Sequence, residues 1–147
     1  MPRPELIETR ERFVVFGTQS TRWKDNDAWG HVNNAVYNSW IDTAITNHLW
    51  SVFPEFGSSQ VIPVAAETKV TFHAPICHPA QIVTGFRVEH LGNSSMRCCV
   101  GVFEGTETTA SAWGHMVHVW IDRQTNESVQ IPGAIREELR KAELRLA

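Results

Sequence analysis

Two aspartates, Asp25 and Asp27, lie a few residues before a helix that the sequence predicts to begin near Asn34. The first N–H groups of a helix have no acceptor within the helix, and the helix dipole places partial positive charge at the same end. Such donors can stabilise the oxyanion that develops during acyl transfer, while a neighbouring carboxylate acts as nucleophile or general base. The spacing therefore indicates a site for acyl transfer, with turn formation or helix capping as the alternative role of either aspartate.

The helix that must position these groups is predicted to run from Asn34 to about residues 50–52, ahead of Pro54. Its apolar residues recur with the spacing of one helix face. They are Val36, Tyr37, Trp40, Ile41, Ala44, Ile45, Leu49 and Trp50. A buried amphipathic helix therefore follows directly on the acidic loop, and the reactive groups lie at its N-terminal end.

The remaining chain reads mostly as strands. Runs rich in Val, Ile, Phe and Thr, many of them alternating with polar residues, predict strands over residues 12–18, 61–74, 81–91, 96–104 and 108–122. A loose N-terminal arm (1–9) and a C-terminal helix (131–147) complete a single domain of residues 1–147. This order predicts an α+β fold, in which a curved antiparallel sheet wraps around one long central helix. Pairing of edge strands between two copies would protect the open sheet edges.

The segment DNDAWGHVNNAVY, followed by an apolar helix, resembles the 4-hydroxybenzoyl-CoA thioesterase family of hotdog-fold proteins. That family's pattern is roughly D-x-D-x-x-G-H-V-N-N-x-x-Y, placed between the first strand and the central helix. The matching residues are Asp25, Asp27, Gly30, His31, Val32, Asn33, Asn34 and Tyr37. The resemblance covers about residues 10–122. It implies a hotdog fold in which two sheets join edge to edge and the active sites lie at the dimer interface.

The same resemblance implies roles for the loop residues. It places the catalytic carboxylate at Asp27, and the backbone N–H near Asn34 is the expected oxyanion donor. The residues implied to bind the substrate or its oxyanion are Gly30, His31, Val32, Asn33, Asn34 and Tyr37. From the residues alone, Asn33 and Asn34 could instead cap the helix, and His31 could bond a loop carbonyl.

The function implied by the resemblance is hydrolysis of an acyl-CoA thioester to a free acid and coenzyme A. No metal and no redox cofactor is implied, and coenzyme A enters only as part of the substrate. The acyl group could instead be carried by an acyl carrier protein, and the enzyme is expected to be a homodimer or a dimer of dimers (a homotetramer). Two alternatives remain open: a hotdog acyl-thioester hydratase or dehydratase, and a non-catalytic acyl-thioester-binding protein.

Five further residues are candidates for the site. Glu67 and His73 are expected on a strand, in a region that faces the central helix, where a second acid could raise the pKa of Asp27. Asp42, two turns into the helix, is an alternative carboxylate. Trp23 and Trp29 flank the acidic loop and could line an acyl pocket, which would favour short, branched or aromatic acyl groups.

The predicted strands contain candidate residues for two further kinds of site, one that binds phosphate and one that binds a metal. Lys69, Arg87 and Arg97 are candidates for binding the phosphates of coenzyme A, or are solvent-exposed charges. His115 and His118 lie three residues apart on a predicted strand. Their side chains are therefore expected on opposite faces, so the pair is not expected to bind a metal.

The composition of the chain disfavours several classes of protein. The chain has 147 residues and a formal net charge of -3, without a block of like charges, which disfavours nucleic-acid binding. No apolar run approaches the ~20 residues that span a membrane, and the first residues lack the apolar core of a signal peptide. The three cysteines, Cys77, Cys98 and Cys99, do not form a disulfide framework. These features predict a cytoplasmic protein without nucleic-acid or membrane partners.

Overall fold

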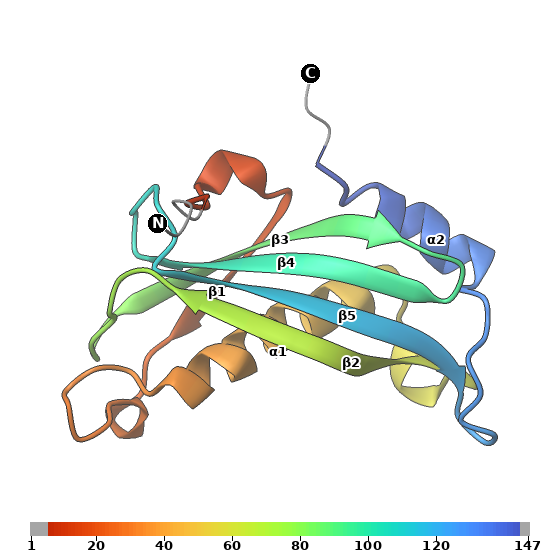
Figure 1. Ribbon diagram of the computed structural model, residues 1–147, viewed down its shortest axis with the longest axis horizontal. Coiled ribbons are helices and arrows are strands. Elements are labelled where there is room, and N and C mark those ends of the chain that lie inside the picture. Colours follow the sequence, from red (N-terminus) through yellow and green to blue (C-terminus); the bar gives the residue numbers. More distant parts are fainter. Residues whose placement is uncertain (1–5, 145–147) are drawn as a thin grey trace, which may run out of the picture.

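The computed structural model describes residues 6–144 (Figure 1). Along this part of the chain the strands and α-helices are β1 (Val15–Ser20), α1 (Asn34–Val52), β2 (Val61–Phe72), β3 (Gln81–Leu91), β4 (Ser95–Glu104), β5 (Ala112–Asp122) and α2 (Gly133–Arg140). Short 3-10 helices lie at Arg10–Arg12, Trp23–Asp25 and Phe56–Ser58. No helix of the described residues is long and apolar enough to cross a membrane.

One antiparallel sheet contains the five strands in the order β1-β3-β4-β5-β2. The sheet curves around α1, which packs against one of its faces (Figure 1). This is the α+β hotdog arrangement that the sequence predicted. β1 and β2 form the two edges of the sheet, so each has a row of backbone groups without a neighbouring strand in the described chain.

The main core lies between α1 and the facing side of the sheet. The buried residues of α1 are Tyr37, Trp40, Ile41, Ile45 and Leu49. Ile41 approaches the sheet so closely that a Cβ atom added at Gly114 of β5 would lie 2.5 Å from its Cδ1 atom. A larger residue at position 114 would therefore push the helix away from the sheet. The glycine allows the close approach that fixes the position of α1.

The opposite, outer face of the sheet is covered by the N-terminal segment. Phe13 packs over two glycines, and Cβ atoms added at Gly85 or Gly101 would meet its side chain at 2.8 and 2.7 Å. Glu8 is 3% exposed, and its carboxylate accepts two hydrogen bonds of 2.9 Å from the guanidinium of Arg87. The predicted loose arm is therefore wrong for Glu8 and Thr9, which are held by the pair with Arg87 and by a bridge to Thr109, while residues 1–5 lie outside the described residues.

The first and last strands begin later than the sequence predicted. The prediction placed a strand over residues 12–18, but Arg10–Arg12 form a 3-10 turn and β1 begins at Val15. The last strand begins at Ala112 instead of residue 108. The loop that precedes it contacts the chain that follows β2. The carbonyl oxygen of Ser111 accepts hydrogen bonds of 2.8 and 3.0 Å from the N–H groups of His73 and Ala74, which fixes the chain beyond β2.

The C-terminal helix is shorter than the predicted range of 131–147. Helix α2 covers Gly133–Arg140 and buries Ile135 and Leu139, and Ala142 follows it into the core. The N–H of Val88 in β3 donates a 2.9 Å hydrogen bond to the carbonyl of Ala142, which ties this end of the chain to the sheet. Residues 145–147 lie outside the described residues.

Candidate active site

The loop before α1 is closed by its own hydrogen bonds. The N–H of Asp27 donates to the carbonyl of His31 at 2.8 Å, and the N–H of Gly30 donates to the carbonyl of Asp27 at 3.0 Å. The Asp27 carboxylate accepts a 2.9 Å hydrogen bond from the N–H of Trp29. Gly30 has a φ of 83°, which a residue with a Cβ rarely adopts. The loop conformation therefore follows from the local sequence and holds Asp27 next to the start of the helix.

Asp25 has a structural role in the same loop. It is 1% exposed, and its carboxylate accepts hydrogen bonds from the backbone N–H (2.8 Å) and the guanidinium (2.9 and 3.1 Å) of Arg22. Its own carbonyl accepts a 2.8 Å bond from the N–H of Asn33. Burial alone would raise the pKa of Asp25, but the hydrogen bonds from Arg22 and the positive charges of Arg22 and Lys24 outweigh it and lower the pKa.

Replacing Asp25 by Asn is expected to lower the free energy of unfolding at neutral pH by about 1–3 kcal/mol, because charged hydrogen bonds to Arg22 are lost. The folded-state pKa of Asp25 is lowered, so its contribution is complete above the ordinary aspartate pKa of about 3.9 and disappears as the pH falls through the folded-state value.

Urea unfolding of both proteins at neutral pH and at about pH 2 measures this contribution. The difference between Asp25→Asn and the unmodified chain should shrink at the lower pH. Asp42→Asn, at an exposed position of α1, serves as the control and should change stability by about 0.5 kcal/mol or less. A loss for Asp25→Asn that is equal at both pH values would contradict the assignment.

The start of α1 provides a hydrogen-bond donor. Asn33 is the N-cap residue, and its side-chain oxygen accepts a 2.9 Å bond from the N–H of Ala35. The N–H of Asn34, the first residue of the helix, has no acceptor among residues 6–144. Its position at the positive end of the helix dipole suits it to bind an anion or a polarised carbonyl oxygen.

Asp27 and Asn34 line the same cavity, which has a volume of about 370 Å³. The residues that line it are Asp27, His31, Val32, Asn34, Tyr37, Phe72, His73, Ala74 and Pro75. One wall is apolar, since the ring of Tyr37 packs edge-on against Phe72 at 5.1 Å. Burial raises the pKa of Tyr37, so its phenol stays neutral. The cavity thus combines a carboxylate, a helix N-terminus and an apolar wall.

Five of the predicted site residues are brought together here, namely Asp27, His31, Val32, Asn34 and Tyr37. Gly30 and Asn33 lie beside the cavity, where they shape the loop and cap the helix. His73, a candidate from the sequence, lines the same cavity. Phe72, Ala74 and Pro75 were not predicted, although the end of a strand before a proline was a signal that a turn lies at this point.

Other candidates lie elsewhere. Glu67 lies on β2, as expected, but it is paired with Val117 on the outer face of the sheet, so its side chain is directed away from α1 and does not line the cavity. Trp23 and Trp29 are 87% and 82% exposed and do not line the cavity in the described chain.

Two more candidates are also away from the cavity. Asp42 is exposed on α1 and is not among the lining residues. Arg87 is paired with Glu8 beneath the N-terminal segment, and this burial excludes it from binding the phosphates of coenzyme A.

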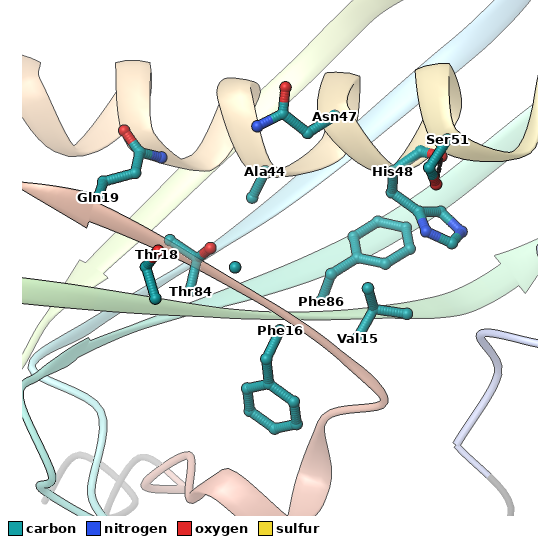
Figure 2. A pocket seen from close by; sticks show the side chains of 11 residues that line it. Val15, Phe16, Thr18, Gln19, Ala44, Asn47, His48, Ser51, Thr84 and Phe86 are labelled. Carbon is teal, nitrogen blue, oxygen red and sulfur yellow. Dashed lines mark hydrogen bonds between the residues drawn. The ribbon is translucent and has the colours of Figure 1, made fainter. Parts of the chain in front are cut away.

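A second cavity lies on the other side of α1, between the helix and β1 (Figure 2). Its volume is about 190 Å³, and its polar residues include Asn47 and Thr84. His48 also borders it, but its ring packs on Phe86 with 4.7 Å between the ring centroids, and burial lowers its pKa. No carboxylate and no thiol lines this cavity in the described part of the chain. The cavity at Asp27 is therefore the candidate active site.

The fold and the site define a hotdog-fold protein with a carboxylate beside the N-terminus of its central helix. The chain belongs to the thioesterase-like superfamily, whose family model matches residues 21–139. None of the curated proteins compared with the chain matches it.

Solved structures extend this relationship. The chain is similar to the PA5185 protein from Pseudomonas aeruginosa strain PAO1, with 34% identity over 94% of this chain and 97% of that chain and a TM-score of 0.90. It is also similar to a thioesterase from Thermus thermophilus solved as a complex with coenzyme A and Zn, with 32% identity, coverage of 87% and 98%, and a TM-score of 0.75. A 1,4-dihydroxy-2-naphthoyl-CoA thioesterase from Synechocystis, 12% identical over 85% and 94% of the two chains, shares the fold with a TM-score of 0.75.

Proposed function

We propose that this chain hydrolyses acyl-coenzyme A thioesters to a carboxylic acid and coenzyme A. The observation that carries the proposal is that the carboxylate of Asp27 and the unpaired N–H of Asn34 line one cavity of the described chain. Membership of the thioesterase-like superfamily supports thioester hydrolysis as the reaction. The similarity to a thioesterase that was solved with coenzyme A supports coenzyme A, instead of an acyl carrier protein, as the carrier of the acyl group.

In the proposed reaction, the thioester carbonyl oxygen accepts a hydrogen bond from the N–H of Asn34. This bond, together with the helix dipole, stabilises the negative charge of the tetrahedral intermediate. Asp27 attacks the carbonyl carbon, the carbon–sulfur bond breaks, and coenzyme A leaves as a thiolate. Water then hydrolyses the resulting mixed anhydride, or in the alternative route Asp27 deprotonates a water that attacks directly. Thiolate is a good leaving group, so neither route requires a strong general acid.

The acyl group is proposed to pack against the apolar wall of Tyr37, Val32 and Phe72. Phe72 is 49% exposed at the end of the free edge strand β2, and Val64 on the same strand is 37% exposed. A second copy that pairs with this edge would cover both residues and enclose the cavity. We therefore propose a homodimer, or a dimer of dimers, as the active form.

The test is release of free thiol from a panel of acyl-CoA esters with short, branched, aromatic and long acyl groups. We expect turnover of at least one ester. The same samples are assayed for hydration of crotonyl-CoA and for binding of coenzyme A esters by calorimetry. Hydration without thiol release would replace the proposal by a hydratase, and binding of the esters without either reaction would replace it by a binding protein.

A further inference from the structure

A row of polar side chains crosses the outer face of the sheet, away from α1. Residues paired directly across β3, β4, β5 and β2 are, in this order, Arg87, Cys99, His115 and Lys69. Side chains of directly paired residues lie on the same face, with Cβ atoms about 4.5–5.5 Å apart. Cys99 and His115 are therefore held side by side by the register of β4 and β5.

The docked N-terminal segment adds a carboxylate to this row. Ligand atoms of Glu8, Cys99 and His115 all lie within 4.8 Å of one another. In a tetrahedral zinc site, bonds of about 2.0–2.3 Å place the ligand atoms roughly 3.3–3.8 Å apart. Shifts of about 1 Å by the three side chains would therefore close the cluster around one ion. A cleft of about 270 Å³ is lined by Glu8 and His115 among others, whereas Cys99 is fully buried beside them.

Glu89 orients the imidazole of His115 by a hydrogen bond. Its carboxylate lies 2.6 Å from Nδ1 of His115. A carboxylate can only accept a hydrogen bond, so Nδ1 donates it, and in the neutral imidazole Nε2 then offers a free lone pair. A carboxylate that fixes the tautomer of a histidine in this way is the usual outer partner of a metal-binding histidine.

We propose that Glu8, Cys99 and His115 bind a divalent transition-metal ion of the zinc class, with water as the fourth ligand. Binding forms a metal–thiolate bond and releases the thiol proton of Cys99 to solvent. A set of one sulfur, one nitrogen and one oxygen ligand selects zinc-like ions over magnesium or calcium, which take oxygen ligands. The ion would join the N-terminal segment to β4 and β5, on the face opposite α1, so thioester hydrolysis at Asp27 would not use it.

The charges around the cluster are compatible with a cation. Arg87 donates to both oxygens of Glu8, and Nε of Arg12 lies 3.1 Å from one of them. A carboxylate has about four acceptor positions, so these contacts leave one for a metal. Glu89 contributes a second negative charge, and loss of the Cys99 proton contributes a third. Lys69, at the end of the row, is exposed.

The test is titration of the metal-free chain with Co2+, followed by the thiolate-to-cobalt charge-transfer absorption, with Zn2+ added afterwards as competitor. We expect one Co2+ per chain and displacement by Zn2+. The band should be absent in Cys99→Ser and retained in Cys77→Ser, whose thiol is exposed. Glu89→Gln should weaken binding by about 10–100-fold.

His115→Gln provides a second ligand variant in case Cys99→Ser does not fold, which circular dichroism reports. It is also expected to lose the band, because Nε2 of His115 is a proposed ligand. The absence of a charge-transfer band in the unmodified chain would overturn the proposal. So would a band that persists in Cys99→Ser and disappears in Cys77→Ser.

Discussion

Replacing Asp27 by Asn is expected to lower kcat for thioester hydrolysis by about 10²–10⁴-fold and to leave the fold intact. Asn has nearly the same shape as Asp, and its side-chain oxygen can still accept the hydrogen bond from the N–H of Trp29 that is 2.9 Å long in the structure. An amide, however, is neither a nucleophile nor a base at this position. Steady-state thiol release with the best ester of the panel measures the loss, and KM should change much less than kcat.

Asp42→Asn is the matched control for this experiment. Asp42 is the alternative carboxylate of α1, but it is exposed and does not line the cavity. Its replacement should leave kcat within about twofold, since surface changes away from a site have small effects. Full activity of Asp27→Asn, with loss of activity in Asp42→Asn, would assign the reaction to the helix carboxylate instead.

Replacing Arg87 by Met is expected to destabilise the protein by up to about 3–5 kcal/mol, because it leaves the buried charge of Glu8 with only the single contact of 3.1 Å to Nε of Arg12. The side chains of Arg87 and Glu8 are only 6% and 5% exposed, and their two hydrogen bonds are 2.9 Å long. The guanidinium also lies 4.8 Å above the ring of Phe13, so its removal loosens the packing of the N-terminal segment. Urea or thermal unfolding, followed by circular dichroism, measures the change.

Two further variants separate a buried charge from a general loss of packing. In Glu8→Gln combined with Arg87→Met, neither charge is left unpaired, so much of the lost stability should return. Arg97→Met removes an exposed arginine, 55% accessible and 3.6 Å from Glu89, and should cost at most about 1 kcal/mol. A loss for Arg87→Met no larger than that for Arg97→Met would show that the pair with Glu8 contributes little.

The sequence predicted those parts of the molecule that depend on local spacing. The apolar residues of the central helix identified its buried face, except for Trp50, which is 45% exposed, and the helix begins at Asn34 as expected. The loop was predictable because a single motif contains Asp27, Gly30 and the helix start. β3 covers Gln81–Leu91, the predicted range, because its alternation is uninterrupted from Ile82 to Val88.

Features that depend on contacts between distant segments were not predictable. The alternation of β2 was misleading at Val64, which the register shift between Ala65 and Glu67 places on the other face from Val70. Arg87 reads as a surface charge unless the docking of Glu8 is known. Cys99 and His115 are neighbours because β4 and β5 pair in a particular register. This register cannot be read from the spacing of residues along one strand.

The closed loop at Asp27 has a consequence for how this family of sites can diversify. The carboxylate and the helix start belong to one segment of eight residues, 27–34, which is closed by hydrogen bonds within it and anchored at Val32, whose N–H donates a 2.8 Å bond to the carbonyl of Ile76. The facing wall, residues 72–75, comes from a different part of the chain. In the proposed reaction, the reacting groups and the facing part of the acyl wall therefore lie on separate segments of the chain. If the proposed function holds, substitutions at 72–75 are expected to change which acyl group fits without altering Asp27 or Asn34.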